Sequence, residues 1–441
     1  MKKITSCTLI FLVFIINIFI MNQSYKNTID LGNVIYIICI TLILLLIYHF
    51  NVDITNLINP QNFILYFFVF FINFGMIISP FYTDILPVYT SSMYYLINCF
   101  IIYIFISVLI SNKNIMKYLQ LKDVLKNIET SNRYRKYIFI GISIIIIYFI
   151  SIKTIPLLGE NSDDLRVESL KGKGFIVLLG YGFLVNSIIF DFLYVLKRED
   201  KIYFIKSLVL YLFAFLVLMG TGYRGISFKI ILILISILLM YKYKKLPIFK
   251  LSILIMILLS SVAIMGYYRS SNIVSFNLEA IYKVTIWRFF VNIYNFQNIS
   301  NFVDVIGFIN GKTYVLDILT LLPGHQISSS YYMKDILGLS FSGGGITPTL
   351  FGEALINFGY EFGLIIVLVV SVIISITSLY LCKNMNKSIS SLQMLIVISF
   401  SLDPIIGSGI MPTILNSLIP VLICRFIIIT LNNIEERKYY R

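Results

Sequence analysis

The stretch YEFGLIIVLVVSVIISITSLYLC, residues 360–382, contains one charged residue in 23 positions. A helix of about 20 apolar residues is long enough to cross the hydrocarbon core of a bilayer. Similar runs recur along almost the whole chain, which is 59% hydrophobic and 13% charged, with a mean hydropathy of +0.90. A soluble domain has about 25% charged residues. The sequence therefore predicts an all-α polytopic integral membrane protein.

We expect about twelve transmembrane helices within a single membrane domain, residues 1–441. The expected spans are 4–21, 32–50, 62–80, 92–111, 137–153, 175–196, 203–220, 226–241, 251–267, 360–382, 389–402 and 413–430. No small-residue cleavage site follows the first run, so we interpret it as a span and not as a signal peptide. Charged residues within the spans are interpreted as structural ion pairs inside the bundle: Asp191, Lys229 and Arg425. The five cysteines show no spacing typical of disulfide frameworks or zinc sites.

Basic residues are unevenly distributed between the connections on the two sides of the membrane. If the N-terminus is cytoplasmic, cytoplasmic segments carry 22 of the 35 lysines and arginines, and outer segments carry 11. Cytoplasmic loops are enriched in basic residues, so we expect both termini in the cytoplasm. The net charge of +14 then reflects contact with an anionic membrane face and not nucleic-acid binding. Residues 268–359 are expected to form one long extracytoplasmic loop.

Two short outer segments carry arginine. Arg166 lies among acidic residues in the segment 154–174, and Arg224 lies between glycines in the tight turn GTGYRG, residues 220–225. A guanidinium group matches the geometry of phosphate and carboxylate. Each arginine also has a simpler interpretation, a self-neutralised solvated loop for Arg166 and snorkelling to lipid headgroups for Arg224.

The long outer loop adds further basic residues. Arg269 lies at the outer end of a span, and Arg288 follows Trp287, the only tryptophan. An aromatic ring beside a guanidinium is suited to binding sugar, whereas the alternative for Trp287 is a residue of the interfacial aromatic belt. The stretch GFINGKT is one residue short of a phosphate-binding loop, so we expect no nucleotide site there. Lys312 within it is a candidate for a phosphate contact.

Two residues of this loop are candidates for catalysis. His325 could take a proton from a hydroxyl near neutral pH, although a lone loop histidine is more often only solvated. Glu353 follows the glycine stretch SFSGGGITP and shares a helical face with Asn357. The helix is expected to begin with Thr347 as its N-cap and Pro348 as its first residue. A carboxylate in an otherwise apolar helix indicates a polar cavity, while the alternative is an interfacial helix with a structural glycine hinge.

Four features together carry a family resemblance. They are the many-span plan with a long late outer loop, IPLLGENSDDLR at 155–166, TGYRG at 221–225, and GGGITPTLFGEALINFG at 343–359. In these features the chain resembles the Wzy-type polymerases of O-antigen and capsular oligosaccharide repeat units. The resemblance implies a glycosyltransferase of the inner (cytoplasmic) membrane. It would move a growing glycan from undecaprenyl pyrophosphate to a hydroxyl of a new lipid-linked repeat unit at the outer face, without nucleotide sugar, metal or other cofactor.

The resemblance also suggests roles, partners and rival functions. The arginines would stabilise the charge of the pyrophosphate, and Glu353 or His325 would act as the base. Expected partners are the undecaprenyl-pyrophosphate-linked glycan, membrane lipid, and a chain-length regulator and flippase of the same pathway. Two other functions stay open: a flippase or exporter of lipid-linked oligosaccharide, which needs charge in the membrane interior, and an O-antigen ligase, which would use a loop histidine. A scaffold without chemistry would not need outward arginines in three loops.

Overall fold

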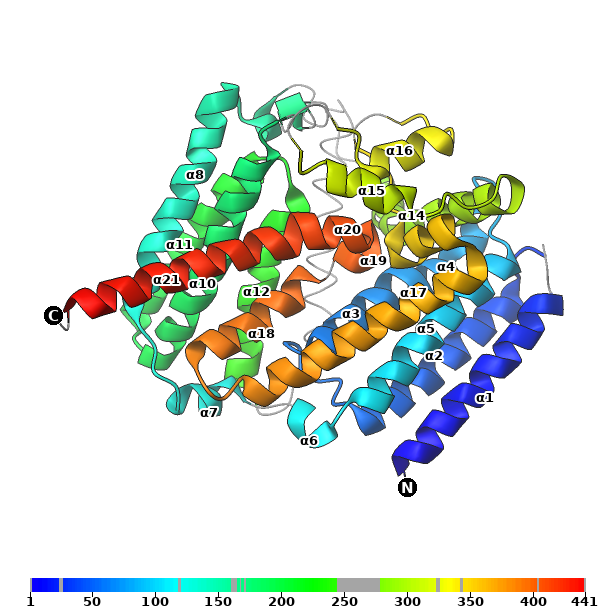
Figure 1. The fold of residues 1–441 in the computed structure, drawn as a ribbon, viewed down its shortest axis with the longest axis horizontal. Helices are drawn as coiled ribbons and strands as arrows, with labels where there is room; N and C mark the ends of the chain where they lie inside the picture. The colour runs from blue at the N-terminus through cyan, green and yellow to red at the C-terminus, as the bar shows by residue number, and fades with distance from the viewer. Residues whose placement is uncertain are drawn as a thin grey trace.

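The structure, a computed structural model, is helical throughout almost all of its described residues. It describes residues 2–23, 27–117, 120–159, 165–166, 168–169, 172–243, 278–322, 326–341, 344–402 and 404–439. Within these ranges, pairing between extended segments is confined to one isolated β-bridge between Thr28 and Tyr89. The expected all-α class is therefore confirmed (Figure 1).

The helices follow one another along the chain with short connections in most places. The first half contains α1 (Lys2–Gln23), α2 (Leu31–Asn51), α3 (Pro60–Phe68), η1 (Val69–Asn73), α4 (Phe74–Ile78), η2 (Ser79–Tyr82), α5 (Thr90–Ile110), α6 (Lys113–Met116), α7 (Leu121–Lys126), η3 (Asn132–Arg135), α8 (Lys136–Ile152), η4 (Pro156–Leu158), α10 (Gly174–Arg198) and α11 (Lys201–Gly220). The second half contains α12 (Arg224–Lys242), α14 (Leu278–Val305), α15 (Lys312–Leu319), α16 (Ser329–Ile336), α17 (Thr349–Asn384), α18 (Ile389–Ser401), α19 (Pro404–Ser408), α20 (Ile410–Thr413), η5 (Ile414–Leu418) and α21 (Ile419–Tyr439).

Eleven helical segments among the described residues are long and apolar enough to cross a membrane. They coincide with eleven of the twelve expected spans, and the remaining one, 251–267, lies outside the described residues. The chain is a multi-pass membrane protein.

The spans form two groups that α18 connects. In the first group α5 lies between α1 and α17, and in the second α10 lies between α8 and α21 (Figure 1). In the apolar stretches of α5 and α10, 78% of the residues are buried, whereas the share is 28–39% in α2, α8, α11 and α12. Helices α5 and α10 therefore form the cores of their groups. Helix α18 contacts α3 and α17 of one group and α10 of the other.

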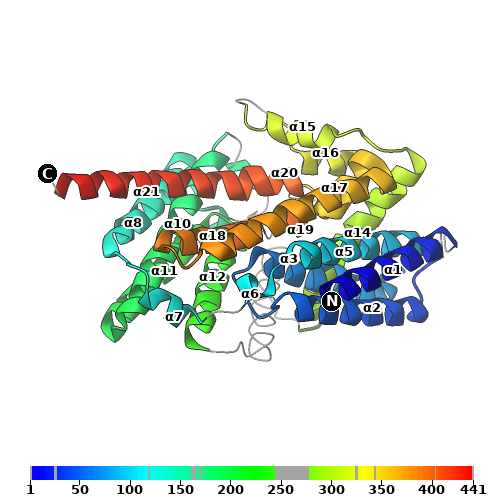
Figure 2. The same ribbon diagram turned by 60° about the horizontal axis from the view of Figure 1, so that its bottom comes forward.

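The long loop predicted at 268–359 contains packed helices. Within its described residues lie α14, α15, α16 and the first turns of α17. Phe290, Phe296 and Ile299 of α14 are fully buried, because this helix packs against α4, η1 and α17. Helices α15 and α16 cover one end of the molecule, which we call the α16 end (Figure 2). The N-terminus, α6 and α7 lie at the opposite end, which we call the α7 end (Figure 1).

The start of α17 differs from the expected cap. The helix begins at Thr349, and Pro348 occupies the cap position, one residue later than predicted. The Thr349 hydroxyl accepts a hydrogen bond from the Gly352 N–H at 3.1 Å and so performs the capping. Thr347 instead accepts hydrogen bonds from the side-chain amide of Asn295, at 3.0 Å to its hydroxyl and 3.2 Å to its carbonyl oxygen.

Helix α17 is divided by a kink at Gly359, whose φ is +74°. A side chain is rarely tolerated at such a φ, so glycine fits this position. The kink separates a short first segment, which carries Glu353 and Asn357, from the long apolar segment 360–382.

Candidate functional site

Three of the sequence motifs meet around Arg166 at the α16 end. A Cβ added at Gly222 of the TGYRG turn would lie 3.4–3.5 Å from three Arg166 side-chain carbons. The guanidinium carbon is 5.2 Å from the ring centre of Tyr223, the next residue of that turn. A Cβ added at Gly344 of the glycine stretch would lie 3.6 Å from a guanidinium nitrogen. The structure therefore places the first arginine segment between the other two motifs.

A second arginine shares the electrostatic environment of Arg166. The pKa of Arg288 on α14 is lowered by loss of hydration and then by the positive charge of Arg166, although its side chain keeps an exposed surface. Burial raises the pKa of Tyr223 to about 12, and burial also raises that of Tyr331 on α16, while Arg166 opposes both shifts. Two neighbouring like charges repel each other, and an anion placed between them relieves that repulsion. This pair is suited to a phosphate group.

Glycine allows the backbone segments of this region to approach closely. A Cβ added at Gly345 would lie 2.4 Å from the carbonyl carbon of Ser330, which is closer than atoms can pack. The next residue, Ile346, donates its N–H to the Ser330 carbonyl oxygen at 3.1 Å. The glycine stretch is therefore fastened to α16, the helix that brings Tyr331 near Arg166.

A cavity of about 350 Å³ lies next to the arginine site. Tyr223 forms part of its wall, so the cavity and the Arg166 environment share a residue. The other walls come from α10, α12 and the segment from Pro404 to Ser417, and they include Lys229 and Pro412. The cavity lies between membrane-spanning helices and is mainly apolar.

Glu353 is fully buried and holds the start of α20. Its Oε2 accepts a hydrogen bond from the Ile410 N–H, and its Oε1 has no hydrogen-bond partner among the described residues. A Cβ added at Gly409, where φ is +100°, would lie 2.6 Å from Oε2. A carboxylate at the amino end of a helix is favoured by the helix dipole. Because α20 continues through η5 into α21, Glu353 caps a long helix from a different element.

Comparison with known families identifies the family of the chain. The family model described as "Putative O-antigen polymerase" matches residues 56–411 of the 441. The chain belongs to this family. No curated protein and no solved structure matches it. Membership supports a role for the chain in O-antigen polymerisation, and the matched range includes Arg166, Arg288 and Glu353.

Asn357 joins α17 to α15. Its side-chain amide donates to the Thr313 hydroxyl of α15 at 2.5 Å, and its Oδ1 accepts from the Thr313 N–H at 3.3 Å. Asp317 of α15 accepts from the N–H and hydroxyl of Ser329 at 2.9 and 2.7 Å, and burial raises the pKa of Asp317. These bonds connect α17, α15 and α16 into one polar chain beneath the α16 end.

Trp287 and Lys312 both contact aromatic side chains. The Trp287 ring packs edge-on against Tyr82 and Phe290, with ring centres 5.9 and 5.5 Å apart. It is the neighbour of Arg288 along α14, but consecutive helical residues point in directions about 100° apart. The Lys312 ammonium lies 4.4 Å from the ring centre of Tyr332 on α16.

Three predicted site residues are not placed. The backbone of α12 begins at Arg224, but the side chain of Arg224 is not described. Arg269 and His325 lie outside the described residues.

The charged residues within the spans differ in their partners. Asp191 lies 3.9 Å from Arg135 and accepts the Tyr211 hydroxyl at 2.7 Å, which confirms an ion pair. The expected ion pair of Arg425 is wrong within the described residues, because neutral groups satisfy its guanidinium: the side chain of Gln393 at 2.8 Å, and the hydroxyl and carbonyl of Ser390 at 2.6 and 3.0 Å. Lys229 lines the cavity, with its ammonium 6.0 Å from the Tyr181 ring centre.

The sequence did not single out Tyr223 and Tyr331, two aromatic residues on whose pKa values the Arg166 charge acts. Tyr223 precedes Arg224 inside the quoted TGYRG turn, so the motif itself carried that signal. Tyr331 lies in a polar helix of the long loop, and no pattern connects it to Arg166.

Proposed function

We propose that the chain polymerises undecaprenyl-pyrophosphate-linked oligosaccharide repeat units at the outer face of the cytoplasmic membrane. The observation that carries this proposal is the packing of Arg166 against the TGYRG turn and the glycine stretch at the α16 end, beside a cavity that shares Tyr223 with it. Family membership supplies the reaction class. The Arg166 guanidinium, whose positive charge also acts on Arg288, suits the pyrophosphate that a lipid-linked donor carries.

In the proposed reaction the bond between the anomeric carbon of the growing glycan and the pyrophosphate oxygen breaks. A hydroxyl oxygen of the incoming repeat unit forms the new glycosidic bond, its proton passes to a base, and lipid pyrophosphate leaves. Negative charge develops on the leaving group, where Arg166 and Arg288 would stabilise it. Tyr223 would orient the Arg166 guanidinium by stacking beneath it at 5.2 Å.

The cavity beside Tyr223 would take the first isoprenoid units of a substrate lipid. Its walls come from α10, α12 and the segment that contains α19 and α20, so it lies among spans and not above them. This position would keep the pyrophosphate at Arg166 and the hydrocarbon chain within the membrane region.

Glu353 is the proposed base, and His325 is the second candidate. The unpartnered Oε1 of Glu353 can accept a hydrogen bond from a hydroxyl, but the side chain is fully buried and lies against the Gly409 turn. The proposal therefore requires the Gly409 turn or the glycine stretch to move before an acceptor hydroxyl reaches the carboxylate. His325 remains in the proposal on the sequence argument alone.

The test is complementation of a deletion strain, read as a gel ladder of surface glycan. Arg166→Ala should reduce polymer about 10²–10³-fold at normal protein level, as expected for loss of a donor to transition-state charge. Arg166→Lys should be impaired, because an ammonium cannot form two parallel bonds to phosphate. Arg198→Ala is the matched control, since Arg198 pairs with Asp200 at 3.3 Å at the α7 end.

Three outcomes separate the functions. A deletion strain that keeps a core with one repeat supports a polymerase. Loss of every repeat with accumulation of short lipid-linked units would support a flippase, and accumulation of long lipid-linked polymer would support a ligase. Full polymer with Arg166→Ala and Arg288→Ala would overturn the assignment of the site.

A further inference from the structure

A larger cavity, of about 700 Å³, lies at the α7 end. It is formed where α10 ends, α11 begins and α12 ends, with α7 closing one side. Its apolar walls are Val195, Leu196, Phe204, Ile205 and Leu238. Cavities of roughly 300–1,000 Å³ are typical of sites for small ligands. None of these residues belongs to the candidate polymerisation site at the opposite end.

The cavity has a charged rim above an apolar interior. On α11, Phe204 lies three residues inside Lys201, and on α12, Leu238 lies four residues inside Lys242. One helical turn is about 5.4 Å long, so the change from charge to hydrocarbon occurs within a single turn on each helix. Both lysines mark the ends of apolar, membrane-spanning helices. An amphiphilic ligand with a compact charged head and a hydrocarbon chain has this distribution.

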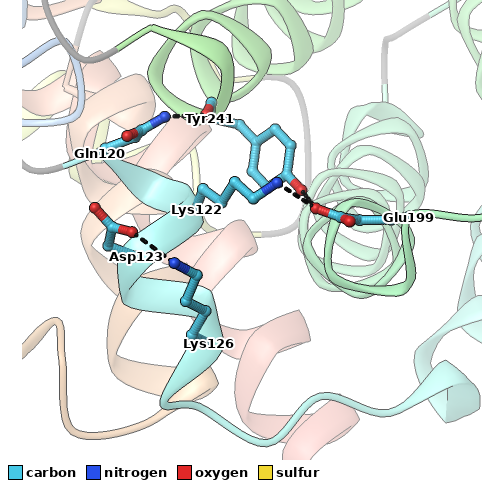
Figure 3. Close-up of polar contacts among 6 residues, drawn as sticks. All are labelled: Gln120, Lys122, Asp123, Lys126, Glu199 and Tyr241. Atoms are coloured by element: carbon cyan, nitrogen blue, oxygen red, sulfur yellow. Dashed lines mark hydrogen bonds and ion pairs between the residues drawn. The ribbon is translucent and has the colours of Figure 1, made fainter.

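Hydrogen bonds fix the rim (Figure 3). The Lys122 ammonium lies 2.6 Å from a Glu199 carboxylate oxygen, which also accepts the Tyr241 hydroxyl at 2.8 Å. The side-chain amide of Gln120 donates to the Tyr241 carbonyl at 3.1 Å. These contacts hold α7 across the ends of α10 and α12, so the rim keeps its shape without a ligand.

The carboxylates of the rim have charged or N–H partners, while two of its lysines have no carboxylate partner among the described residues; the Lys242 ammonium lies 5.7 Å from the ring centre of Tyr243. Glu199 binds Lys122, and Asp200 accepts the N–H groups of Ile202 and Tyr203 as the cap of α11 and lies 3.3 Å from Arg198. Within the described part of the chain, neither Lys201 nor Lys242 forms an ion pair with a carboxylate. Among the described residues, the rim therefore presents two ammonium groups without a carboxylate partner at the edge of the apolar cavity.

We propose that this cavity binds an acidic phospholipid, with its phosphate at Lys201 and Lys242 and an acyl chain along Leu238 and Phe204. Basic pockets between transmembrane helices bind anionic lipid headgroups. Basic residues at helix ends also follow from membrane orientation alone, but orientation does not create an apolar hollow beneath them. A free phosphate has no hydrocarbon chain that could contact the apolar walls. A zwitterionic lipid has no net negative charge to balance the two lysines without carboxylate partners.

The experiment uses the purified full chain, delipidated in detergent. Phosphatidylglycerol and phosphatidylcholine with identical acyl chains are titrated, and bound lipid is counted by native mass spectrometry. Each basic residue near an acidic headgroup contributes about 1 kcal/mol, or roughly fivefold, so two lysines should favour phosphatidylglycerol by about 30-fold. Equal binding of the two lipids would overturn the proposal.

A double variant and its control locate the effect. The double variant Lys201→Gln, Lys242→Gln should lose the preference, while Lys126→Gln should keep it, because Lys126 pairs with Asp123 at 3.1 Å outside the cavity (Figure 3). An equal loss with Lys126→Gln would show surface attraction only and would overturn the site.

Filling the cavity gives an independent readout. Leu238→Trp should lower binding of both lipids, whereas Leu216→Trp, on the exposed face of α11, should not. Unchanged phosphatidylglycerol binding in Leu238→Trp would place the lipid elsewhere and reject the proposal. Absence of any lipid binding in the wild type, as when another polypeptide segment fills the cavity, would also reject it.

Discussion

Substitution of Gly345 by alanine should separate the glycine stretch from α16. The added Cβ would lie 2.4 Å from the Ser330 carbonyl carbon and 2.6 Å from its carbonyl oxygen. Ordinary contacts begin near 3.4 Å, so one of the two backbone segments must move by about 1 Å. Rotation of the Ser330 side chain can remove its hydroxyl, which would lie 2.5 Å from the added Cβ, but it cannot remove the two backbone atoms.

The size of the effect can be worked from two contributions. Overpacking a closely packed position costs about 1–3 kcal/mol. The movement also weakens the 3.1 Å bond from the Ile346 N–H to the Ser330 carbonyl oxygen, and a hydrogen bond contributes about 0.5–1.5 kcal/mol. Local opening at α16 should therefore become about 2–4 kcal/mol easier, which corresponds to roughly 30- to 1,000-fold faster amide exchange.

The assay is hydrogen exchange of α16 in purified protein, combined with the surface-glycan ladder. Gly344→Ala is the matched control, because its Cβ would meet a guanidinium nitrogen of Arg166 at an ordinary 3.6 Å. We expect Gly345→Ala to expose α16 amides and shorten the ladder, and Gly344→Ala to leave the exchange unchanged. Wild-type exchange of α16 in Gly345→Ala would refute the close-approach argument.

Two further predictions concern the buried carboxyl groups. Glu353→Gln keeps an oxygen that can accept the Ile410 N–H, so the free energy of unfolding should fall by only about 1 kcal/mol. Loss of a base should lower the polymerisation rate about 10²–10⁴-fold. Full polymer in a complementation assay would show that Glu353 is not the base. Burial raises the pKa of Asp317, so its folded state binds the proton more tightly, and the stability of the α15–α16 contact should be greatest below the ordinary carboxyl pKa and fall as pH rises through the raised value. Asp317→Asn should abolish this pH dependence of α16 exchange, and an unchanged slope would contradict the assignment.

The spans could be predicted from the sequence because each carries its own signal of about 20 apolar residues. Helix α14 could not, because polar residues interrupt its hydropathy although they are buried. Gln297 is fully buried and accepts the Tyr89 N–H at 3.0 Å, and Asn295 donates to Thr347. Such side chains look like loop residues in the sequence, since the backbone groups that satisfy them lie elsewhere in the chain.

The candidate site was predictable in its residue types but not in its geometry. A guanidinium in an outer segment indicates an anion wherever it lies, so Arg166 and Arg288 could be selected one at a time. No periodicity relates residues in different connections, and so the contacts of Arg166 with the Gly222 turn and the glycine stretch needed the structure. Likewise, the sequence predicted polar surroundings for Glu353, but the Ile410 N–H that it holds is a backbone group without a sequence signal.

The contacts around the site connect in a ring that starts and ends at Arg166. Glycine occurs at several of these contacts because the segments approach closely there. Gly344 lies against Arg166, and the same stretch leads into the first segment of α17, where Glu353 holds the start of α20. Helix α20 supplies Pro412 to the cavity wall, and Tyr223 on that wall returns to Arg166. If the proposed function holds, the position of the lipid headgroup at Arg166 and the cavity for the lipid chain are therefore connected through direct contacts. A change at Glu353 should alter the cavity as well as the chemistry, because the carboxylate contacts the helix that forms its wall.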